Sequence, residues 1–207
     1  MTAQIHPTAE IEHGVEIGPG TAIWDHVHVR GPARIGSDCI VGEKTYIAHG
    51  VDVGDRVKIN AFVYVCQGVV IEDGVMVSAG TIFTNDRYPR ATAPDLQALR
   101  ASAPGPDTPE TFVREGATIG AGAVIGPGLE IGRFAMVGMG AVLTRSVDPF
   151  HLVTGNPAAT AGYVCRCGHT LLRVAGGAAP DVGEVECRSC GAIYKIHAGE
   201  VTESGTA

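Results

Sequence analysis

An aliphatic residue recurs at every sixth position through most of this 207-residue chain. The series starts at Ile5, runs without a change of phase to Phe83, and resumes in the same phase from Val113 to Leu143. A period of six matches neither the 3.6-residue turn of a helix nor the simple alternation of a long strand. The repeat therefore predicts a short strand and a turn in every six residues, and it fixes the architecture before any single element is considered.

Each hexapeptide supplies one flat face and one corner of a solenoid. A single unit buries little, but stacked units bury a continuous aliphatic column. Glycine often follows the aliphatic residue directly, as at Gly18, Gly54 and Gly120, and this position predicts a turn with positive φ. The strands of an ordinary sandwich would instead be spaced irregularly, with about 8 to 12 residues between turns.

The pattern resembles the hexapeptide-repeat acyltransferases over residues 3 to about 163. This resemblance implies an all-β fold, a left-handed parallel β-helix with three sides per coil. The left hand rests on the resemblance alone, because general rules favour right-handed crossovers. We therefore expect a β-helix acyltransferase domain over residues 1–163.

Composition narrows the setting of this domain. The chain is 45% hydrophobic with few aromatic residues, which suits a narrow interior of Ile, Val and Ala. No apolar run approaches the roughly 18 residues of a membrane span, and the repeats begin where a signal peptide would lie. The net charge of −7 argues against nucleic acid or an anionic membrane as the main partner. We expect a cytoplasmic protein.

Four of the six cysteines form two close pairs, each followed by glycine. These are Cys165 and Cys167, then Cys187 and Cys190. Such pairs are typical of a zinc ribbon, in which four thiolates close around one structural ion. The first pair has one intervening residue rather than the usual two, and His169 is a reserve ligand. Two disulfides are the alternative, which a cytosolic chain disfavours.

The cysteine pairs define the end of the chain. We expect a zinc-ribbon module over residues 164–197, with Zn²⁺ as a structural cofactor. The polar residues 198–207 are predicted to form a disordered tail.

One break interrupts the repeat, between Phe83 and Val113. It predicts an ejected loop near residues 84–112, because resumption in phase keeps the corner and makes the insertion an outward excursion. Long loops in compact domains tend to be functional, so the chemistry is expected here.

Stacking the coils by 18 residues creates two outward columns beside this loop. One contains His49, Gln67 and Asn85, and the other contains His28, Tyr46 and Tyr64. Neighbours in a column lie roughly 4.8 Å apart, as in adjacent strands. The columns would form a polar and aromatic wall at the foot of the loop. A ladder that only stabilises the solenoid is the alternative interpretation.

Several motifs resemble one branch of the superfamily, which N-acetylates amino sugars on nucleotide carriers. They are Ile23-Trp24, Phe83-Thr84-Asn85, Pro89-Arg90-Ala91, the segment 116–120 and Gly155-Asn156-Pro157-Ala158. The branch includes enzymes acting on UDP-2-acetamido-3-amino-2,3-dideoxyglucuronate and on dTDP-3-amino-dideoxyhexoses. Two departures are the longer loop and Ala159, which replaces a basic residue often found after this Pro-Ala.

The resemblance implies a homotrimer that binds acetyl-CoA and a nucleotide sugar in the groove between two subunits. It places Asn85 near the sugar amine, which we expect it to orient, and the donor arm along the late coils. The residues expected to contact the donor are Ala121, Gly138, Met139, Gly140, Arg145 and Asn156.

Transfer to an amine makes modest chemical demands. An amine with a pKa near 8 is partly neutral at pH 7, so positioning and oxyanion stabilisation are the main tasks. His49 is a candidate proton acceptor, and Gln67 and Tyr64 are expected to contact substrate. Charged contacts to a sugar carboxylate or diphosphate are expected from Lys58, Arg87 and Arg90.

Three other functions compete with this one. O-acetylation of a hydroxyl would require His49 as a true base. A γ-type carbonic anhydrase would need a set of zinc histidines whose His-x4-His spacing is absent here. A non-catalytic assembly solenoid would bind no acetyl-CoA.

Overall fold

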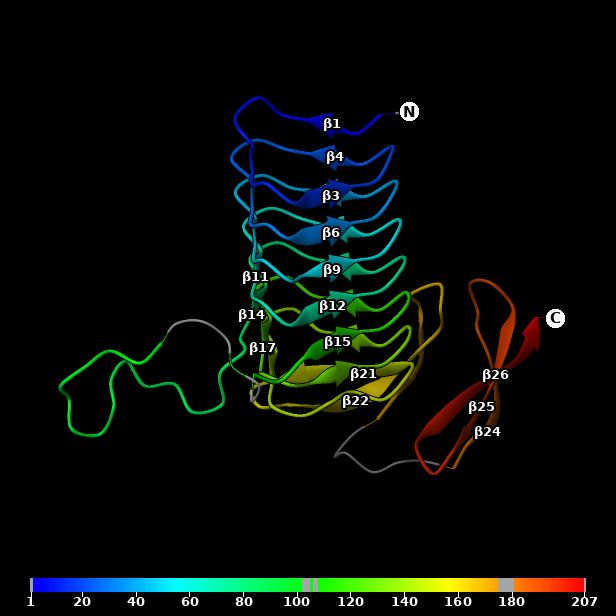
Figure 1. Cartoon of the computed structure of the whole chain (residues 1–207). Coiled ribbons are helices and arrows are strands. Elements are labelled where there is room, and N and C mark those ends of the chain that lie inside the picture. Colours follow the sequence, from blue (N-terminus) through cyan, green and yellow to red (C-terminus); the bar gives the residue numbers. More distant parts are fainter. Residues whose placement is uncertain (1, 102–104, 106–107, 175–180, 207) are drawn as a thin grey trace.

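The computed structural model describes residues 2–101, 105, 108–174 and 181–206, and every regular element among them is a β-strand. Three sheets, whose strands pair in parallel throughout the coils, form the sides of a solenoid, with the ejected loop leaving one flank and a small C-terminal sheet beside the last coils (Figure 1). Within the described residues, no helix has the length and apolarity needed to cross a membrane.

The three sides are called sheets A, B and C. Sheet A contains β1 (Gln4–Ile5), β4 (Ala22–Ile23), β7 (Ile40–Val41), β10 (Lys58–Ile59), β13 (Met76–Val77), β16 (Thr118–Ile119), β19 (Met136–Val137), β21 (His151–Gly155), β22 (Ala158–Val164) and β23 (Thr170–Arg173). Sheet B contains β2 (Glu10–Ile11), β5 (His28–Val29), β8 (Tyr46–Ile47), β11 (Tyr64–Val65), β14 (Ile82–Phe83), β17 (Val124–Ile125) and β20 (Val142–Leu143). Sheet C contains β3 (Val15–Ile17), β6 (Ala33–Ile35), β9 (Asp52–Val53), β12 (Val69–Ile71), β15 (Thr111–Val113) and β18 (Glu130–Ile131).

The register of the strands follows the six-residue period. Ile59 pairs with Val41 on one side and with Val77 on the other, each one coil away. Phe83 pairs with Ile125 across the inserted loop, so the coil closes in phase as predicted. The aliphatic slots face inward and are buried from Ile23 to Leu143, which gives the continuous hydrophobic column expected of stacked repeats.

The glycines that directly follow the aliphatic slots are needed for a different reason from the predicted one. Gly18 and Gly120 do not have positive φ; the left-handed residues lie two positions later, at Gly20 and Gly122. A Cβ on Gly18 would lie 2.6 Å from the carbonyl carbon of Gly36. These glycines are therefore required by the close approach of successive corners, and the predicted turn was wrong in its position.

The C-terminal region also differs from the expected division. β23 follows the first cysteine pair but belongs to sheet A, where it pairs with β22, so residue 163 is not a structural boundary. A separate sheet contains β24 (Gly183–Glu186), β25 (Ala192–His197) and β26 (Glu200–Thr206). The prediction of a disordered tail over 198–207 is therefore wrong for residues 200–206, whose strand pairs with β25. Residue 207 lies outside the described residues.

Candidate functional site

The predicted polar column forms one corner of the solenoid, between sheets B and C, where the ejected loop leaves. We call His49, Gln67 and Asn85 at this position the loop corner. The side-chain amide nitrogen of Asn85 donates a hydrogen bond of 3.2 Å to the main-chain oxygen of Gln67, one coil away. A Cβ on Gly50 would meet Cγ of Gln67 at 3.5 Å, so Gln67 stacks beneath the corner that holds His49. All three side chains are half-buried.

Gln67 has a buried acceptor in this corner. Its side-chain oxygen Oε1 is inaccessible to solvent and receives no hydrogen bond from the described part of the chain. An acceptor left in that state costs about 1–3 kcal/mol of desolvation, and a donor brought by a ligand would recover much of it. Because Asn85 uses its amide nitrogen to bind Gln67, its own carbonyl oxygen is left on the opposite side of the amide.

The aromatic column lies on sheet B beside the loop corner. The rings of Tyr46 and Tyr64 stack at 5.2 Å with an angle of 7° between their planes, and His28 meets Tyr46 edge-on at 5.4 Å. Tyr64 keeps 45% of its surface exposed. Burial, with Tyr46 as a second cause, raises the pKa of Tyr64, so its hydroxyl is neutral near pH 7.

A thiol at the same corner is not a nucleophile. Cys66 precedes Gln67 in the chain and is buried at 4% exposure. Burial raises the pKa of the Cys66 thiol to about 11, because the thiolate loses its hydration in the core. Only the thiolate attacks electrophiles, so Cys66 is a packing residue here.

Of the three predicted cationic contacts, Arg87 lies at the loop corner and the other two lie elsewhere. The guanidinium of Arg87 packs over Gly128, at the same corner one coil further along, where a Cβ on Gly128 would meet its Nη2 at 2.9 Å. Arg90 lies on the ejected loop and donates to the main-chain oxygen of Pro89 at 2.8 Å. Lys58 belongs to β10 of sheet A, a different side of the solenoid from Tyr64.

The predicted donor contacts divide between two edges of sheet B. Ala121 and Gly140 stack at the corner between sheets A and B, where the Gly140 amide donates to the Ala121 oxygen at 2.8 Å, and this corner also holds Gly138 and Met139. We call it the glycine corner. Asn156 lies in the turn between β21 and β22, in sheet A, and Thr154, near the end of β21, lies against Gly138. Arg145 follows β20 and lies on the opposite edge, below the loop corner.

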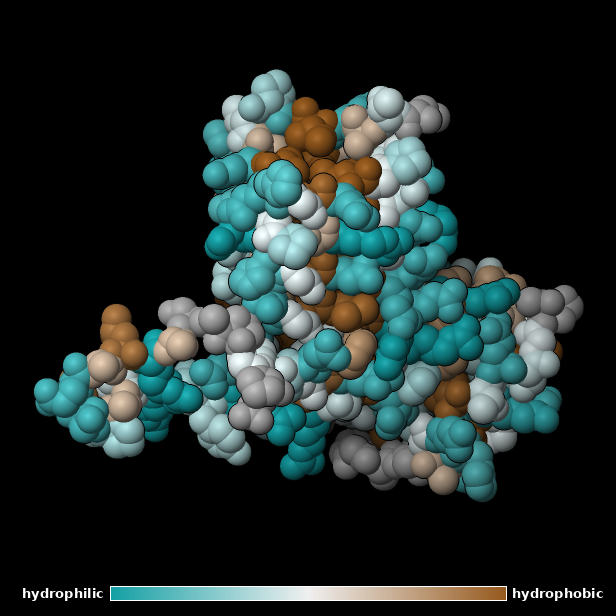
Figure 2. Space-filling model, in the orientation of Figure 1, coloured by the Kyte–Doolittle hydropathy of each residue, from teal (hydrophilic) through white to brown (hydrophobic). Residues whose placement is uncertain are grey.

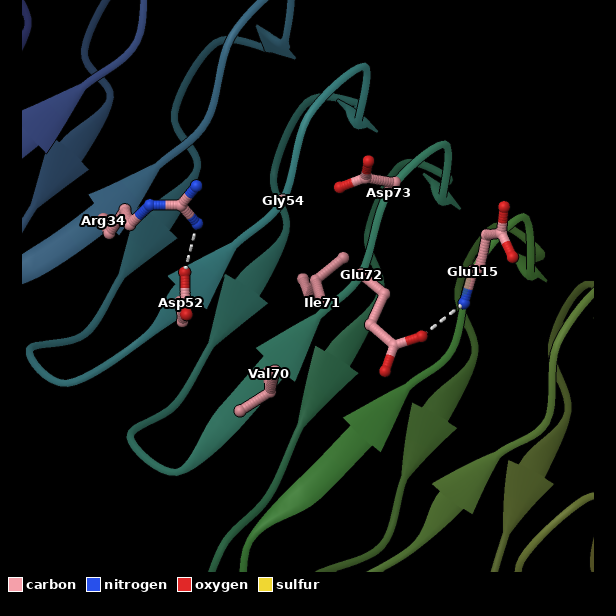
Figure 3. A pocket seen from close by; sticks show the side chains of 8 residues that line it. All are labelled: Arg34, Asp52, Gly54, Val70, Ile71, Glu72, Asp73 and Glu115. Carbon is pink, nitrogen blue, oxygen red and sulfur yellow. Dashed lines mark hydrogen bonds and ion pairs between the residues drawn. The ribbon is translucent and has the colours of Figure 1, made fainter.

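Sheet C presents a different kind of surface. A hollow of about 380 Å³ is lined by Arg34, Asp52, Gly54, Val70, Ile71, Glu72, Asp73 and Glu115 (Figure 3). Its charges are already matched: Arg34 contacts Asp52 at 2.8 Å, and Glu72 accepts from Arg114 at 2.8 Å and from the Glu115 amide at 2.9 Å. This face is a ladder of ion pairs between coils.

The four cysteines of the C-terminal region converge. Their sulfur atoms all lie within 4.8 Å of one another, with 3.4 Å between Cys165 and Cys190 and 3.6 Å between Cys167 and Cys187. No disulfide joins them. A tetrahedral ion with bonds of about 2.3 Å would need sulfurs about 3.8 Å apart, so the arrangement fits a metal. His169 lies beside Cys167 at 3.6 Å, outside this group.

Sequence reasoning missed the aromatic residues around this cluster. Tyr194 is fully buried and its hydroxyl lies 3.2 Å from Sγ of Cys165. Phe150 packs against the Tyr194 ring from the end of the solenoid. The available signal was the appearance of Phe134 and Phe150 at the corner between sheets C and A, where the earlier coils carry glycine or polar residues.

Family models match the coils on both sides of the ejected loop. The model described as bacterial transferase hexapeptide (six repeats) matches residues 14–49 and 32–66, and the hexapeptide repeat of succinyl-transferase matches residues 114–145. The two models together cover residues 14–66 and 114–145, so the chain contains hexapeptide repeats of the kind that these transferase models describe. Its ejected loop interrupts this run, with matched repeats before and after it.

A curated relative and two solved structures resemble this hexapeptide-repeat chain. The relative is the dTDP-3-amino-3,6-dideoxy-alpha-D-galactopyranose 3-N-acetyltransferase of Aneurinibacillus thermoaerophilus, 39% identical over 93 residues, which are 45% of this chain and 44% of the relative. The match thus spans less than half of that relative's length.

The two solved structures are similar to this chain in fold. LpxA, a UDP-N-acetylglucosamine acyltransferase from Bacteroides fragilis, gives a TM-score of 0.63 at 18% identity, over 78% of this chain and 61% of that one. AntD, an N-acyltransferase from Bacillus cereus in complex with dTDP and 3-hydroxybutyryl-CoA, gives 0.51 at 21% identity, over 80% and 81%. These likenesses confirm the expected left-handed parallel β-helix.

Proposed function

We propose that this chain transfers an acetyl group from acetyl-CoA to the amino group of a nucleotide-linked 3-amino sugar, a step in the biosynthesis of a surface polysaccharide or glycoconjugate. The observation that carries the proposal is the loop corner, where the buried Gln67 oxygen lacks a donor beside Asn85. A primary amine brings two or more N–H groups to these two acceptors, whereas a hydroxyl brings one. The 3-N-acetyltransferase resemblance supports the same substrate class.

The proposed chemistry needs little more than positioning. The carbonyl oxygen of Asn85, together with that of Gln67 once its side chain turns outward, would hold the amine, which is partly neutral near pH 7, in line with the thioester. Main-chain amides of the solenoid corners are the candidate donors to the oxyanion. His49 lies next to Gln67 in the column and would accept a proton directly or through water. Tyr64 would form the adjacent wall for the sugar nucleotide.

The complete site is proposed to form between two copies of the chain. The glycine corner and the loop corner lie on opposite edges of sheet B, so one chain separates the expected donor contacts from Asn85. A trimer in which the glycine corner of one subunit faces the loop corner of the next would bring them together. Lys58, on a different side from Asn85, would then be available only to a neighbouring subunit's site, and Arg87 and Arg90 would follow the loop.

Substitutions at the loop corner test the acceptor role. We expect Asn85→Ala and Gln67→Ala to lower kcat with an amino sugar by about a hundredfold, the cost of a misplaced nucleophile. Gln4→Ala, an exposed glutamine on sheet A, is the matched control. Thiol release from acetyl-CoA with a panel of nucleotide 3-amino sugars measures each rate. Full activity in both corner variants would refute the assignment.

His49 separates amine transfer from hydroxyl transfer. For an amine we expect His49→Ala to cost less than about a hundredfold. A loss beyond about a thousandfold, with activity on hydroxyl acceptors, would instead establish His49 as the base of an O-acetyltransferase.

Mixed oligomers test the shared site. Asn85→Ala and Met139→Glu subunits should each have about a hundredth of the wild-type activity or less when alone, the second because it places a negative charge on the expected path of CoA. Co-assembled in equal amounts, they should recover about a quarter of the wild-type activity, because that share of interfaces pairs two intact corners. No recovery in a verified mixed trimer would place the site within one chain.

We also propose that Cys165, Cys167, Cys187 and Cys190 bind one structural Zn²⁺. The main chain supports the site, because the Gly168 and Gly191 amides donate to the carbonyl oxygens of Cys165 and Cys187 at 2.8 and 2.9 Å, closing two tight turns. Metal analysis should give one zinc per chain, reduced to none by replacing all four cysteines with serine. Zinc retained after that change would refute the ligand set.

The compartment follows from the donor. Acetyl-CoA is a cytoplasmic metabolite, so the proposed reaction takes place in the cytoplasm and requires neither nucleic acid nor membrane as a partner.

A further inference from the structure

An aromatic stack joins the last coils of the solenoid to the C-terminal sheet. The rings of Phe134 and Phe150 stack at 5.6 Å, and Phe150 meets Tyr194 edge-on at 5.4 Å. Arg133 covers the outer end, 5.1 Å from the centre of the Phe134 ring. Gly116 makes room for the stack, because a Cβ there would lie 2.2 Å from the Phe134 ring.

Tyr194 connects this stack to the four cysteines. Its ring is fully buried, and its hydroxyl lies 3.2 Å from Sγ of Cys165 and accepts a hydrogen bond of 3.1 Å from the Arg166 amide. The same hydrophobic cluster contains Phe150, Cys165 and Cys187. A change at the cysteine centre is therefore felt directly by side chains of the solenoid end.

The main chain makes a second connection. β22 begins beside the Asn156–Pro157 turn and ends at Val164, immediately before Cys165. It pairs antiparallel with β21, whose Leu152 and Val153 pair with Met136 and Val137 of β19 in the solenoid. The turn at one end of this hairpin and the cysteine centre at the other thus belong to one hydrogen-bonded unit.

His151 connects the β21–β22 hairpin to the C-terminal sheet. Its Nε2 lies 2.8 Å from the main-chain oxygen of Gly199, in the turn between β25 and β26, and its Nδ1 lies 3.3 Å from the Thr160 hydroxyl across the hairpin. The ring also packs edge-on against Tyr163 at 4.9 Å. β21 is therefore held by the C-terminal sheet as well as by the solenoid.

From these contacts we propose that the four-cysteine centre is a positioning device for the Gly155–Asn156–Pro157 turn. With metal bound, Cys165 and Tyr194 fix the far end of β22, and the turn is held against the glycine corner. Without metal, the hairpin loosens and the turn loses its fixed place. The part concerning acetyl-CoA rests on the function proposed above, in which this turn contacts the donor.

The effect is confined to one end of the molecule. Each coil of a solenoid contacts only its neighbours, so a disturbance weakens with distance along the stack. Asn85 and Gln67 lie several coils above the hairpin and make no contact with it. Metal binding therefore controls the affinity for the donor and leaves the affinity for the amino sugar unchanged.

Hydrogen exchange followed by mass spectrometry tests the device without activity. The full-length protein is compared with and without zinc, together with Cys187→Ser. Exchange in residues 150–164 should rise by about tenfold or more on metal loss, while residues 20–80 stay unchanged, as expected of local opening. Cys39→Thr is the matched control, because Thr21, Thr45 and Thr81 occupy equivalent buried positions in other coils.

Kinetics supply the second measurement. The KM for acetyl-CoA should rise by about tenfold in zinc-free protein, with kcat and the KM for the amino sugar within about twofold. Tyr194→Phe keeps all four sulfurs and should retain zinc, yet it should raise the same KM by about fivefold, the weight of one hydrogen bond. This variant keeps the test available where Cys187→Ser fails to fold.

The outcomes are separable. Unchanged exchange in residues 150–164, an equal rise throughout the solenoid, or parallel rises in both KM values would each overturn the positioning role. An absence of acetyl transfer to every amino sugar would refute the proposed function alone. The exchange measurement would still decide whether the cysteine centre holds the hairpin.

Discussion

The two ends of the solenoid are finished in different ways. At the N-terminal end the first aliphatic slot, Ile5, keeps 46% of its surface exposed, and hydrophobic atoms are visible there on the surface (Figure 2). At the C-terminal end Leu143, and Leu152 and Val153 of the hairpin strand β21, are at most 5% exposed. A stack of identical coils has no natural end, so its last hydrophobic layer must be covered or left in water. Among the described residues, those that cover such a layer lie at the C-terminal end.

Removing the stack at its centre should have the largest effect. Phe150 is 3% exposed, and Phe150→Ala should lower the free energy of unfolding of the C-terminal end by about 3–5 kcal/mol. Phe62→Ala is the matched control, since both phenylalanines have positive φ (63° and 59°) but Phe62 is 56% exposed. Denaturation followed by near-ultraviolet circular dichroism measures both. Equal losses would show that the stack adds nothing beyond an ordinary corner.

The same aliphatic slot can be compared at the end and in the middle of sheet A. Ile59 is fully buried, so Ile59→Ala should cost about 2–5 kcal/mol, the sum of lost burial and a cavity. Ile5→Ala should cost about 1 kcal/mol or less, because half of that side chain already contacts water. Thermal unfolding of the two variants gives the difference. A large loss for Ile5→Ala would mean that another surface covers the N-terminal end.

The smallest effect is expected for the ion pair between Glu12 and Arg30, near the N-terminal end of the solenoid. A hydrogen bond from Arg30 lowers the pKa of Glu12 to about 2, against an ordinary value of 4.5. A carboxyl whose pKa falls on folding stabilises the fold above its unfolded pKa, and this contribution is lost as the pH falls from about 4.5 to about 2. Wild type and Glu12→Gln should therefore differ slightly at pH 6 and converge near pH 2 in thermal unfolding. A constant difference across that range would contradict the ion-pair origin.

The repeat made much of the fold predictable. Ile59, Val77 and Phe83 could be assigned to inward slots by counting, and the loop corner followed because residues one coil apart share a face. The stacking of Gln67 with Asn85 and of Tyr46 with Tyr64 is observed where the count placed it. Their catalytic roles remain predictions. Local periodicity sufficed because every contact in a solenoid is with the neighbouring coil.

Other features could not be predicted by counting along the six-residue repeat. Gly18 looked like a turn residue, but its lack of a side chain is needed because Gly36 of the next coil lies directly against it, a contact that only stacked corners create. The polar composition of residues 200–206 favoured disorder, yet β26 is held by pairing with β25. Lys58 could be assigned to an outward position beside the Ile59 slot. That it lies on a different side of the solenoid from the loop corner is seen only in the three-dimensional arrangement of the sheets.

The sequence by itself determined the coil, the phase of the ejected loop and the two close cysteine pairs, because each depends on spacings of a few residues. Only the tertiary structure decided how the last coil of the solenoid is covered, with Tyr194 between Cys165 and Phe150. Those residues are far apart in the chain and follow no period. Their meeting depends on the folding back of β22 and on the C-terminal sheet, which no local spacing specifies.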